Sequence, residues 1–200
     1  MMSNRRRQGE QTKRKVAEAA RELFALKGYT ATSIEDIVAE TGSSKGNIYY
    51  HFKSKEGLFL YLLDEWDQEW LTRWEEREDA FKSVRDKLVG LARLYVEHDL
   101  NHPLSKACDE FMAQESDKNE VKAESERYMA KRIAFNRKLL EEGMRTGEIR
   151  TDDAHLLGLV LEAWMMGVGE IARRYINEPS AIELYMKSVE VFLEGAGPSK

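Results

Sequence analysis

The sequence predicts an all-α protein of about nine helices. Apolar residues recur at every third or fourth position along almost all of the 200-residue chain, which is the spacing of one face of an α-helix. The chain contains only three prolines and few runs of β-branched residues, so no segment has the pattern of a strand. A hydrophobic fraction of 42% is enough to enclose a core.

The first two helices are bounded by caps and glycines. A helix over about residues 11–27 ends before Gly28, the residue type that commonly follows a helix. A short second helix begins after Thr32 or Ser33, either of which can cap its first turn, and it ends at Gly42.

The third helix follows after a tight turn, over the segment SSKGNIYYHF at residues 43–52. Ser54 caps a fourth helix of about six turns. The remaining helices are expected at 80–100, 104–115, 119–146 (ended by Gly147), 152–174 (capped by Thr151) and 180–193 (entered through Pro179).

Charge divides the chain into two parts. Residues 1–55 contain 11 Lys or Arg and 6 Asp or Glu, a net charge of +5. The whole chain has 31 basic and 36 acidic residues, so the remaining 145 residues hold 20 and 30 of them and carry −10. A basic segment can bind a polyanion by releasing its counterions, whereas an acidic one is repelled. We therefore expect a nucleic-acid-binding domain over 1–56 and a second domain over 57–200.

Composition also indicates the compartment. A single cysteine, Cys108, cannot form an intramolecular disulfide, and the first residues are basic and polar rather than the apolar core of a secretory signal. The most apolar stretch, residues 156–169, is shorter than the roughly 20 residues that cross a bilayer, and it includes Glu162. We expect a cytoplasmic protein without a membrane span.

The third helix is more polar than a core helix needs to be. Ile48 and Phe52, four residues apart, point to the core. A short helix, a tight turn and a second short helix form a helix-turn-helix, whose second helix enters the major groove of DNA. Gly46 is a poor helix former, which indicates a close approach to the backbone there. The groups that can meet DNA are Ser43, Ser44, Lys45, Asn47, Tyr49, Tyr50, His51 and Lys55.

Residues 19–59, AARELFALKGYTATSIEDIVAETGSSKGNIYYHFKSKEGLF, resemble the DNA-binding domain of the TetR family of bacterial repressors. The shared pattern is Phe-x-x-x-Gly-Tyr, Thr-x-x-x-Ile and Gly-x-x-Tyr-x-His-Phe-x-x-Lys. The resemblance implies that Gly46 and Tyr49 lie against bases. It also implies that phosphates are held by Thr32, Ser43, Ser44, Lys45, Tyr50, His51 and Lys55. The basic stretch 4–15 could reach a minor groove or project freely, and we expect the second.

In this family the C-terminal helices form a ligand cavity, and the fourth helix links it to the DNA-binding domain. Trp66, Asp67 and Trp70 combine aromatic rings with a carboxylate, which is what an organic cation needs. The same residues also fit a plain apolar stripe beside a solvated acidic face, the interpretation that we prefer for Trp74. The candidate ligand residues are Trp66, Asp67, Trp70, Asp99, Phe111, Glu115, Tyr128, Met129, Glu162, Trp164 and Met165.

The family resemblance also implies a dimer interface. The helices over 152–174 and 180–193 are amphipathic, and apolar surface left over after packing within the chain could pair with a second copy. The candidate dimerisation residues are Leu157, Leu161, Trp164, Val168, Tyr185, Val189 and Phe192.

Other functions fit less well. The four histidines form no metal-ligand motif, no glycine-rich phosphate loop is present, and Cys108 has no evident base partner, so we expect no enzyme, metal or cofactor. A helical adaptor that binds only protein would leave the DNA-facing residues unexplained. The predicted function is a repressor that binds an inverted-repeat operator as a homodimer and is released by a small lipophilic effector. A cation is one effector class, and a neutral or anionic molecule such as a fatty acyl thioester is the alternative.

Overall fold

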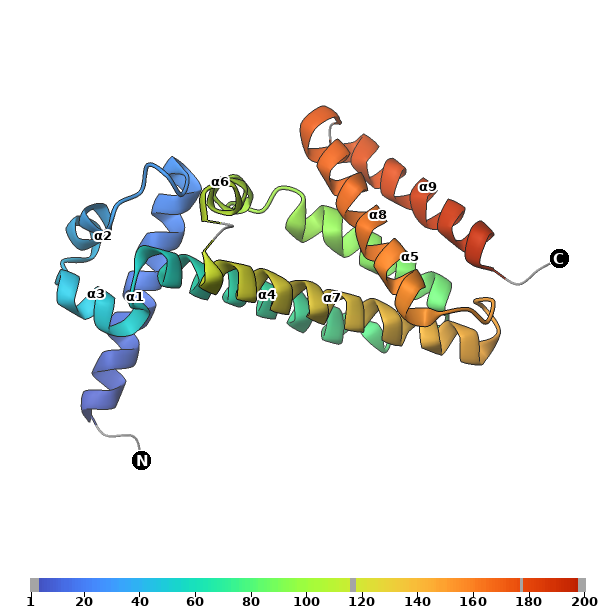
Figure 1. Ribbon diagram of the computed structural model, residues 1–200, viewed down its shortest axis with the longest axis horizontal. Coiled ribbons are helices and arrows are strands. Elements are labelled where there is room, and N and C mark those ends of the chain that lie inside the picture. The colour runs from blue at the N-terminus through green and yellow to red at the C-terminus, as the bar shows by residue number, and fades with distance from the viewer. Residues whose placement is uncertain (1–3, 116–117, 177, 198–200) are drawn as a thin grey trace. The chain divides into compact units, whose positions relative to one another are not determined.

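The computed structural model describes residues 4–115, 118–176 and 178–197, and the side chains of residues 4, 5, 115, 120, 178 and 179 lie outside that description. Within these residues the regular structure is helical throughout, as predicted. One π-helical turn, η1 (Tyr95–Asp99), continues the fifth helix. The helices, labelled in Figure 1, are α1 (Asn4–Lys27), α2 (Ile34–Thr41), α3 (Lys45–Phe52), α4 (Lys55–Glu78), α5 (Val84–Leu94), α6 (Ser105–Glu115), α7 (Asn119–Thr146), α8 (Ala154–Tyr175) and α9 (Glu178–Ala196).

The chain forms two compact units. The N-terminal unit comprises the described residues up to 69 together with 103–124, and the C-terminal unit comprises 70–102 and the described residues from 125 onward. The N-terminal unit therefore contains α6 and the first part of α4 in addition to the helix-turn-helix.

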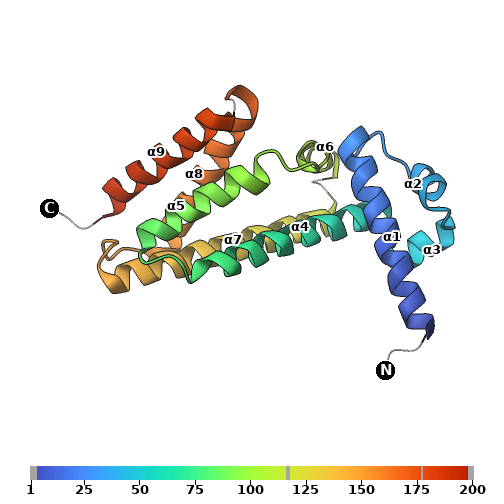
Figure 2. The ribbon, with the colours of Figure 1, turned by 180° about the vertical axis from the view of Figure 1, so that it is seen from behind.

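Three predicted helix starts need correction. α5 begins at Val84, capped by Ser83, and not near residue 80. α1 begins at Asn4 instead of near residue 11, so the basic stretch forms the first turns of a helix and does not project freely. Arginine, glutamine, glutamate and lysine are good helix formers, and they make up most of this stretch. Figures 1 and 2 both show these turns extending beyond α3. α8 is capped by Asp153, whose carboxylate accepts the backbone N–H of His155 at 2.9 Å, and not by Thr151.

Side-chain caps define the helix-turn-helix. The Ser33 hydroxyl accepts the N–H of Asp36 at 3.1 Å, and the Asp36 carboxylate accepts the N–H of Ser33 at 2.8 Å. This reciprocal capping box starts α2. Gly42 ends α2 with a left-handed φ of 67°, and the Ser44 hydroxyl then accepts the N–H of Asn47 at 3.2 Å to start α3. The short turn between two strong caps fixes the orientation of α3 against α2.

Four aromatic side chains hold the N-terminal unit together. Phe24 of α1, Tyr29 of the following loop, Phe59 of α4 and Phe111 of α6 are at most 2% exposed. The ring centroids of Phe24 and Phe59, of Tyr29 and Phe111, and of Phe59 and Phe111 are each 4.9 Å apart. Because each ring comes from a different segment, this aromatic cluster joins α1 to α4 and α6.

The C-terminal unit has its own aromatic core. Trp70 and Trp74 of α4 stack in parallel, with centroids 6.2 Å apart and planes 3° apart. Phe135 of α7 meets the two indoles edge-on at 5.4 and 5.2 Å. α8 and α9 lie side by side in Figures 1 and 2, and Tyr185 of α9 is buried in the same core.

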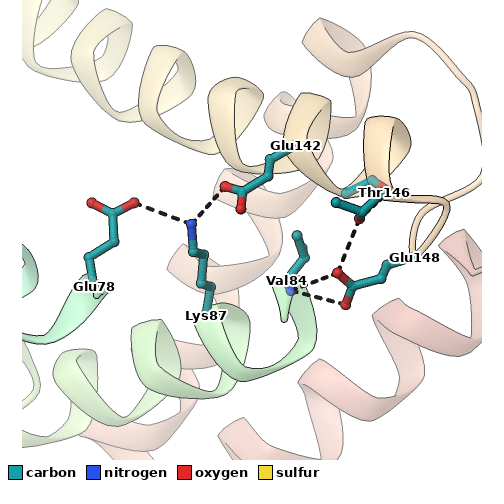
Figure 3. A network of polar contacts seen from close by, with 7 residues as sticks. Glu78, Val84, Lys87, Glu142, Thr146 and Glu148 are labelled. Carbon is teal, nitrogen blue, oxygen red and sulfur yellow. Dashed lines mark hydrogen bonds and ion pairs between the residues drawn. The ribbon is translucent and has the colours of Figure 1, made fainter. Parts of the chain in front are cut away.

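A polar network ties α4, α5 and α7 together at one end of the C-terminal unit (Figure 3). The Lys87 ammonium, whose side chain is 12% exposed, lies between Glu142 at 2.7 Å and Glu78 at 3.4 Å. These carboxylates raise the pKa of Lys87 against the opposing effect of its burial. The Glu148 carboxylate accepts the N–H of Val84 at 3.0 Å, which satisfies a free donor at the start of α5. The network therefore fixes where α5 begins.

α8 bears on the expectation that the chain has no membrane span. Among the described residues it is the helix that is long and apolar enough to cross a bilayer, by length and composition alone. The apolar stretch 156–169 is only part of this helix. Glu162 lies in the middle of α8 with a side chain 6% exposed and an arginine partner, which is typical of a helix packed within protein.

Gly28 should tolerate alanine less well than Gly147. Both have a left-handed φ, of 84° and 81°. A Cβ at Gly28 would lie 2.5 Å from Oε1 and 2.6 Å from Oε2 of Glu110, and Oε2 accepts the N–H of Thr30 at 2.9 Å. At Gly147 nothing lies within 4 Å of a built Cβ. We expect Gly147→Ala to cost about 1 kcal/mol and Gly28→Ala about 2 kcal/mol, from backbone strain plus a lost hydrogen bond.

Urea unfolding of the two variants measures this difference. In a Glu110→Ala background the extra cost at Gly28 should disappear, because the Glu110 carboxylate is the partner in both the clash and the hydrogen bond. Equal destabilisation by Gly28→Ala and Gly147→Ala in the wild-type background would contradict the assignment.

Candidate DNA interface and effector site

α3 buries one face and exposes the other. Ile48 and Phe52 are 0% and 4% exposed and belong to the core of the N-terminal unit. Tyr49 and Tyr50 are 45% and 81% exposed. Two large exposed aromatic side chains in succession are typical of a binding surface, because soluble proteins otherwise cover such groups.

Gly46 is not required by the fold of the protein itself. Its φ is not left-handed, and the nearest atom to a Cβ built there is the Ser44 hydroxyl oxygen at 4.0 Å. A glycine inside a short helix costs about 1 kcal/mol relative to alanine. The fold therefore leaves room for a side chain at Gly46, as it also does at Gly167 of α8 and Gly195 of α9, where nothing lies within 4 Å of a built Cβ.

Lys45 has a competing partner. Its ammonium forms an ion pair with Glu35 of α2, and both side chains are exposed. The hydrogen bond from Lys45 lowers the pKa of Glu35, and the same bond raises the pKa of Lys45. A phosphate that binds Lys45 must therefore displace or share the Glu35 carboxylate.

Two predicted phosphate ligands lie differently from expectation. Thr32 is 1% exposed, and its hydroxyl donates to the backbone carbonyl of Gly28 at 2.7 Å, so the prediction that this hydroxyl holds a phosphate is wrong. Its role is to secure the loop before α2. Lys55 begins α4, and its ammonium lies 4.2 Å from the centroid of the Tyr29 ring. Ser43, Asn47 and His51 are half-buried at the rim of the exposed face of α3.

The C-terminal unit encloses a cation among aromatic rings. The guanidinium carbon of Arg132 lies 4.7 Å from the ring centroid of Trp70 and 4.6 Å from that of Tyr95. Arg132 Nε donates to Glu162 Oε1 at 3.4 Å, and the Asn136 amide donates to Glu162 Oε2 at 2.8 Å. Trp70 and Glu162, both predicted as ligand residues, are thus brought together around a guanidinium that the chain supplies.

Sequence reasoning missed Arg132 and Asn136. They are four residues apart on α7, and the same face continues with Leu139 and Leu140, which are 5% and 0% exposed. Two polar side chains on an otherwise apolar helix face are the signal that could have revealed them. Tyr95 was missed because it lies in the π-helical turn, which changes the register of the side chains after α5.

Two indole groups near this cation are unsatisfied. The Nε1–H groups of Trp70 and Trp74 are buried without a hydrogen-bond acceptor among the described residues. Each such donor costs about 1–3 kcal/mol. Trp74, interpreted from the sequence as part of a plain stripe, stacks on Trp70 and so belongs to the same aromatic group.

The other predicted ligand residues are divided between the two units. In the N-terminal unit, Trp66 is half-buried and Asp67 is 7% exposed. Phe111 is a member of the aromatic cluster, where it packs against Tyr29 and Phe59. The side chain of Glu115 lies outside the described residues.

In the C-terminal unit, Met165 is 2% exposed and part of the core, while Tyr128 is 45% exposed. Met129 and Trp164 are half-buried. Asp99 acts on Tyr185: burial raises the pKa of this phenol to about 12, and the Asp99 charge adds to the effect.

The predicted dimerisation residues fall into two groups that differ in burial within the single chain. Leu161, Tyr185 and Val189 are at most 2% exposed within the single chain, so the prediction that they meet a second copy is wrong. Helical periodicity identified their apolar face but not the neighbour that covers it. Val168 is 9% exposed, and Leu157 is half-buried. Trp164 and Phe192 are also half-buried, and their rings stack with centroids 5.7 Å apart. The apolar side chains that remain exposed on α8 and α9 are Leu156, Leu159, Val160, Met166, Ile171, Ile182 and Val191.

A capped helix-turn-helix with an exposed polar second helix, in a chain with a second helical unit, defines a DNA-binding transcriptional regulator. Residues 16–62 match the family model of bacterial regulatory proteins of the tetR family, and residues 66–197 match the C-terminal region of QacR-like proteins. The chain belongs to the TetR family, with a C-terminal region of the QacR-like type.

Individual relatives agree with this assignment. The chain is 31% identical over 184 residues to the HTH-type transcriptional regulator QacR of Staphylococcus aureus, covering 92% of this chain and 97% of that protein. It is 31% identical to a TetR transcriptional regulator from Chloroflexus aurantiacus, with a TM-score of 0.71 and coverage of 92% and 95%. A TetR-family regulator from Cytophaga hutchinsonii, 19% identical, shares the fold with a TM-score of 0.80 over 100% of both chains.

Glu35→Gln should strengthen DNA binding. The change removes the carboxylate that competes with phosphate for Lys45, so we expect affinity to rise about three- to tenfold at low salt and the gain to shrink as salt is added. Fluorescence anisotropy with a labelled duplex measures it. Glu141→Gln is the matched control, because it removes a charge from an exposed ion pair with Arg137 in the C-terminal unit. Unchanged binding by Glu35→Gln, or an equal gain in the control, would contradict the role given to this pair.

Proposed function

We propose that this protein is a cytoplasmic repressor that binds an inverted-repeat DNA operator as a homodimer and is released by a small lipophilic effector. The proposed division of labour follows the sequence: residues 1–56 bind DNA, and residues 57–200 bind the effector and the second copy. A cation is the effector class that we favour, with a neutral or anionic molecule as the alternative.

The observation that carries the DNA-binding proposal is Gly46. This residue lies in a short helix where the fold has room for a side chain, beside the exposed rings of Tyr49 and Tyr50. A base edge or sugar of DNA against the Gly46 backbone accounts for the missing side chain. Tyr49 then lies where it can contact bases, while Lys45 and Lys55 are suited to phosphates.

Gly46→Ala should separate folding from function. Alanine favours the helix, so we expect the free energy of unfolding to rise by about 0.5–1 kcal/mol. Affinity for the operator should nevertheless fall at least about tenfold, because the methyl group occupies the space needed by DNA. Urea unfolding and anisotropy on the same samples measure both.

The control for this experiment is Gly195→Ala, at an exposed helical glycine of the C-terminal unit with nothing within 4 Å of a built Cβ. It should leave DNA binding unchanged. Full operator affinity in Gly46→Ala would refute the placement of DNA against this helix.

Dimerisation is proposed through the exposed apolar side chains of α8 and α9. Val160 and Met166 of α8 are 48% and 55% exposed, and Val191 of α9 is 54% exposed. Exposed apolar side chains of this kind are costly in water and are suited to a two-fold interface. Inverted-repeat DNA then matches the symmetry of the pair.

Val160→Glu should convert the dimer to monomer at micromolar concentration, since it places a charge in an apolar interface without altering the core. Sedimentation velocity measures the change. Leu26→Glu, at a residue 80% exposed on α1, is the control and should remain dimeric. Leu161→Glu is a poor test, because Leu161 is 0% exposed and the charge would disrupt the core. A wild-type monomer that binds the operator tightly would contradict the proposal.

Release is proposed to pass through α4 and α6. α4 begins beside the helix-turn-helix at Lys55 and continues to Glu78, and α6 supplies Phe111 to the aromatic cluster. An effector releases DNA only by binding the released conformation better, and a shift from 99:1 to 1:99 needs about 5.5 kcal/mol of differential affinity. Two effector sites in a dimer can share this difference.

Tetraphenylphosphonium and tetraphenylborate test the favoured charge class, because they have nearly the same size and opposite charge. We expect the cation to quench tryptophan fluorescence and to dissociate the operator complex at a concentration at least about tenfold lower than the anion. Asp67→Asn should weaken the response to the cation. Release of DNA by the anion alone would contradict a cationic effector. It would support the alternative class, a neutral or anionic molecule, and the repressor proposal would stand.

A further inference from the structure

Arg132 occupies a site that has all the parts of a cation-binding cage. Its guanidinium lies between the rings of Trp70 and Tyr95, at 4.7 and 4.6 Å, and its side chain is 6% exposed. The electron-rich faces of aromatic rings attract cations, and the attraction is strongest where water is excluded. Glu162 completes the cage with a negative charge that is equally buried.

The carboxylate of this cage does not depend on Arg132 for its position. Asn136 donates to Glu162 Oε2 at 2.8 Å, a good hydrogen bond. The bond from Arg132 Nε to Glu162 Oε1 is longer, at 3.4 Å, and involves a single donor of the guanidinium. Paired arginine and carboxylate groups usually form two short parallel hydrogen bonds. The Glu162 carboxylate of the cage is therefore anchored by Asn136 as well as by Arg132.

A cationic effector that binds against the ring face of Trp70 must displace the Arg132 guanidinium. The guanidinium already covers Trp70 and Tyr95, and a second positive charge beside it would be repelled in a site of low dielectric. The Arg132 side chain is long and flexible, so it can leave the cage without any movement of the α7 backbone. Its departure leaves Glu162 buried and unpaired unless another cation takes its place.

We infer that Arg132 is a built-in competitor of cationic effectors and a specificity-determining residue of the effector site. A cation enters the cage by exchange: its charge replaces the guanidinium between the rings and beside Glu162. Small hydrated cations are excluded because they bring no apolar surface to offset the exchange, whereas lipophilic cations do. The inference rests on the proposed effector-responsive function. It deepens that proposal by naming Arg132 as the residue that determines which cations bind.

Arg132→Ala tests the exchange directly, with purified protein and no DNA. Ethylguanidinium, which reproduces the end of the arginine side chain, is the probe, and ethylurea is its neutral analogue of the same shape. We expect ethylguanidinium to bind Arg132→Ala at least about tenfold more tightly than the wild type and to raise its melting temperature, with no such effect of ethylurea. Isothermal titration calorimetry and thermal unfolding measure the two effects.

Two further variants separate the cage from general charge. Arg137→Ala removes an exposed arginine of the same helix, paired with Glu141, and should gain no affinity for the probe. Arg132→Ala combined with Glu162→Gln should lose the gain, because the carboxylate is then neutral. Equal binding of ethylguanidinium and ethylurea by Arg132→Ala, or no gain over the wild type, would overturn the inference.

Should Arg132→Ala fail to fold alone, its refolding yield from urea is measured with each probe at equal concentration. Rescue by ethylguanidinium and not by ethylurea supports the inference, and equal yields overturn it. The outcome is independent of the operator experiment. A gain of probe binding in Arg132→Ala supports the cage even if tetraphenylphosphonium fails to release DNA, a failure that would instead count against the proposed cationic effector.

Discussion

The N-terminal unit depends on the contact among Phe24, Tyr29, Phe59 and Phe111. These rings join α1 and the loop before α2 to α4 and α6, and each is at most 2% exposed. Removal of one such ring from a core typically costs about 3–5 kcal/mol, a large part of the stability of a small domain. The cluster therefore makes the helix-turn-helix part of a larger body that includes α6. Glu110 of α6 reinforces the contact by accepting the N–H of Thr30 at 2.9 Å.

The placement of charge follows a different rule in each unit. In the N-terminal unit the basic groups around α3 are exposed, where they can exchange a carboxylate such as Glu35 for a phosphate at little cost in desolvation. In the C-terminal unit Arg132 and Glu162 are buried, where an unpaired charge is expensive. The exposed pair is suited to reversible contact with a polyanion, and the buried pair is suited to selection among ligands by charge.

Much of the fold was predictable from the sequence because its signals are local. The repeat of apolar residues predicted the helices, and Ser33, Gly42 and Ser54 marked their ends correctly because caps act within one turn. Ile48 and Phe52 were assigned to the core by their spacing alone. The exposed face of α3, where DNA contact is proposed, could be predicted for the same reason: once the buried face of a short helix is known, the opposite face is known too.

The cluster around Arg132, which is the proposed effector site, was harder to predict, because its residues come from segments far apart in the chain. Trp70, Tyr95, Arg132 and Glu162 belong to α4, η1, α7 and α8, and no local pattern specifies that they meet. Periodicity also could not distinguish Leu161, covered within its own chain, from its exposed neighbour Val160. Both lie on an apolar face, and only the packing of α8 against its neighbours decides which of them is free to meet a second copy.

Selection of bound sequences from a pool of random DNA duplexes by the purified full-length protein tests the central claim most directly. The account predicts that sequencing recovers an enriched inverted repeat, whose half-sites match two copies of α3 related by a two-fold axis. Recovery of duplexes without an inverted repeat, or no enrichment over the starting pool at physiological salt, would contradict it.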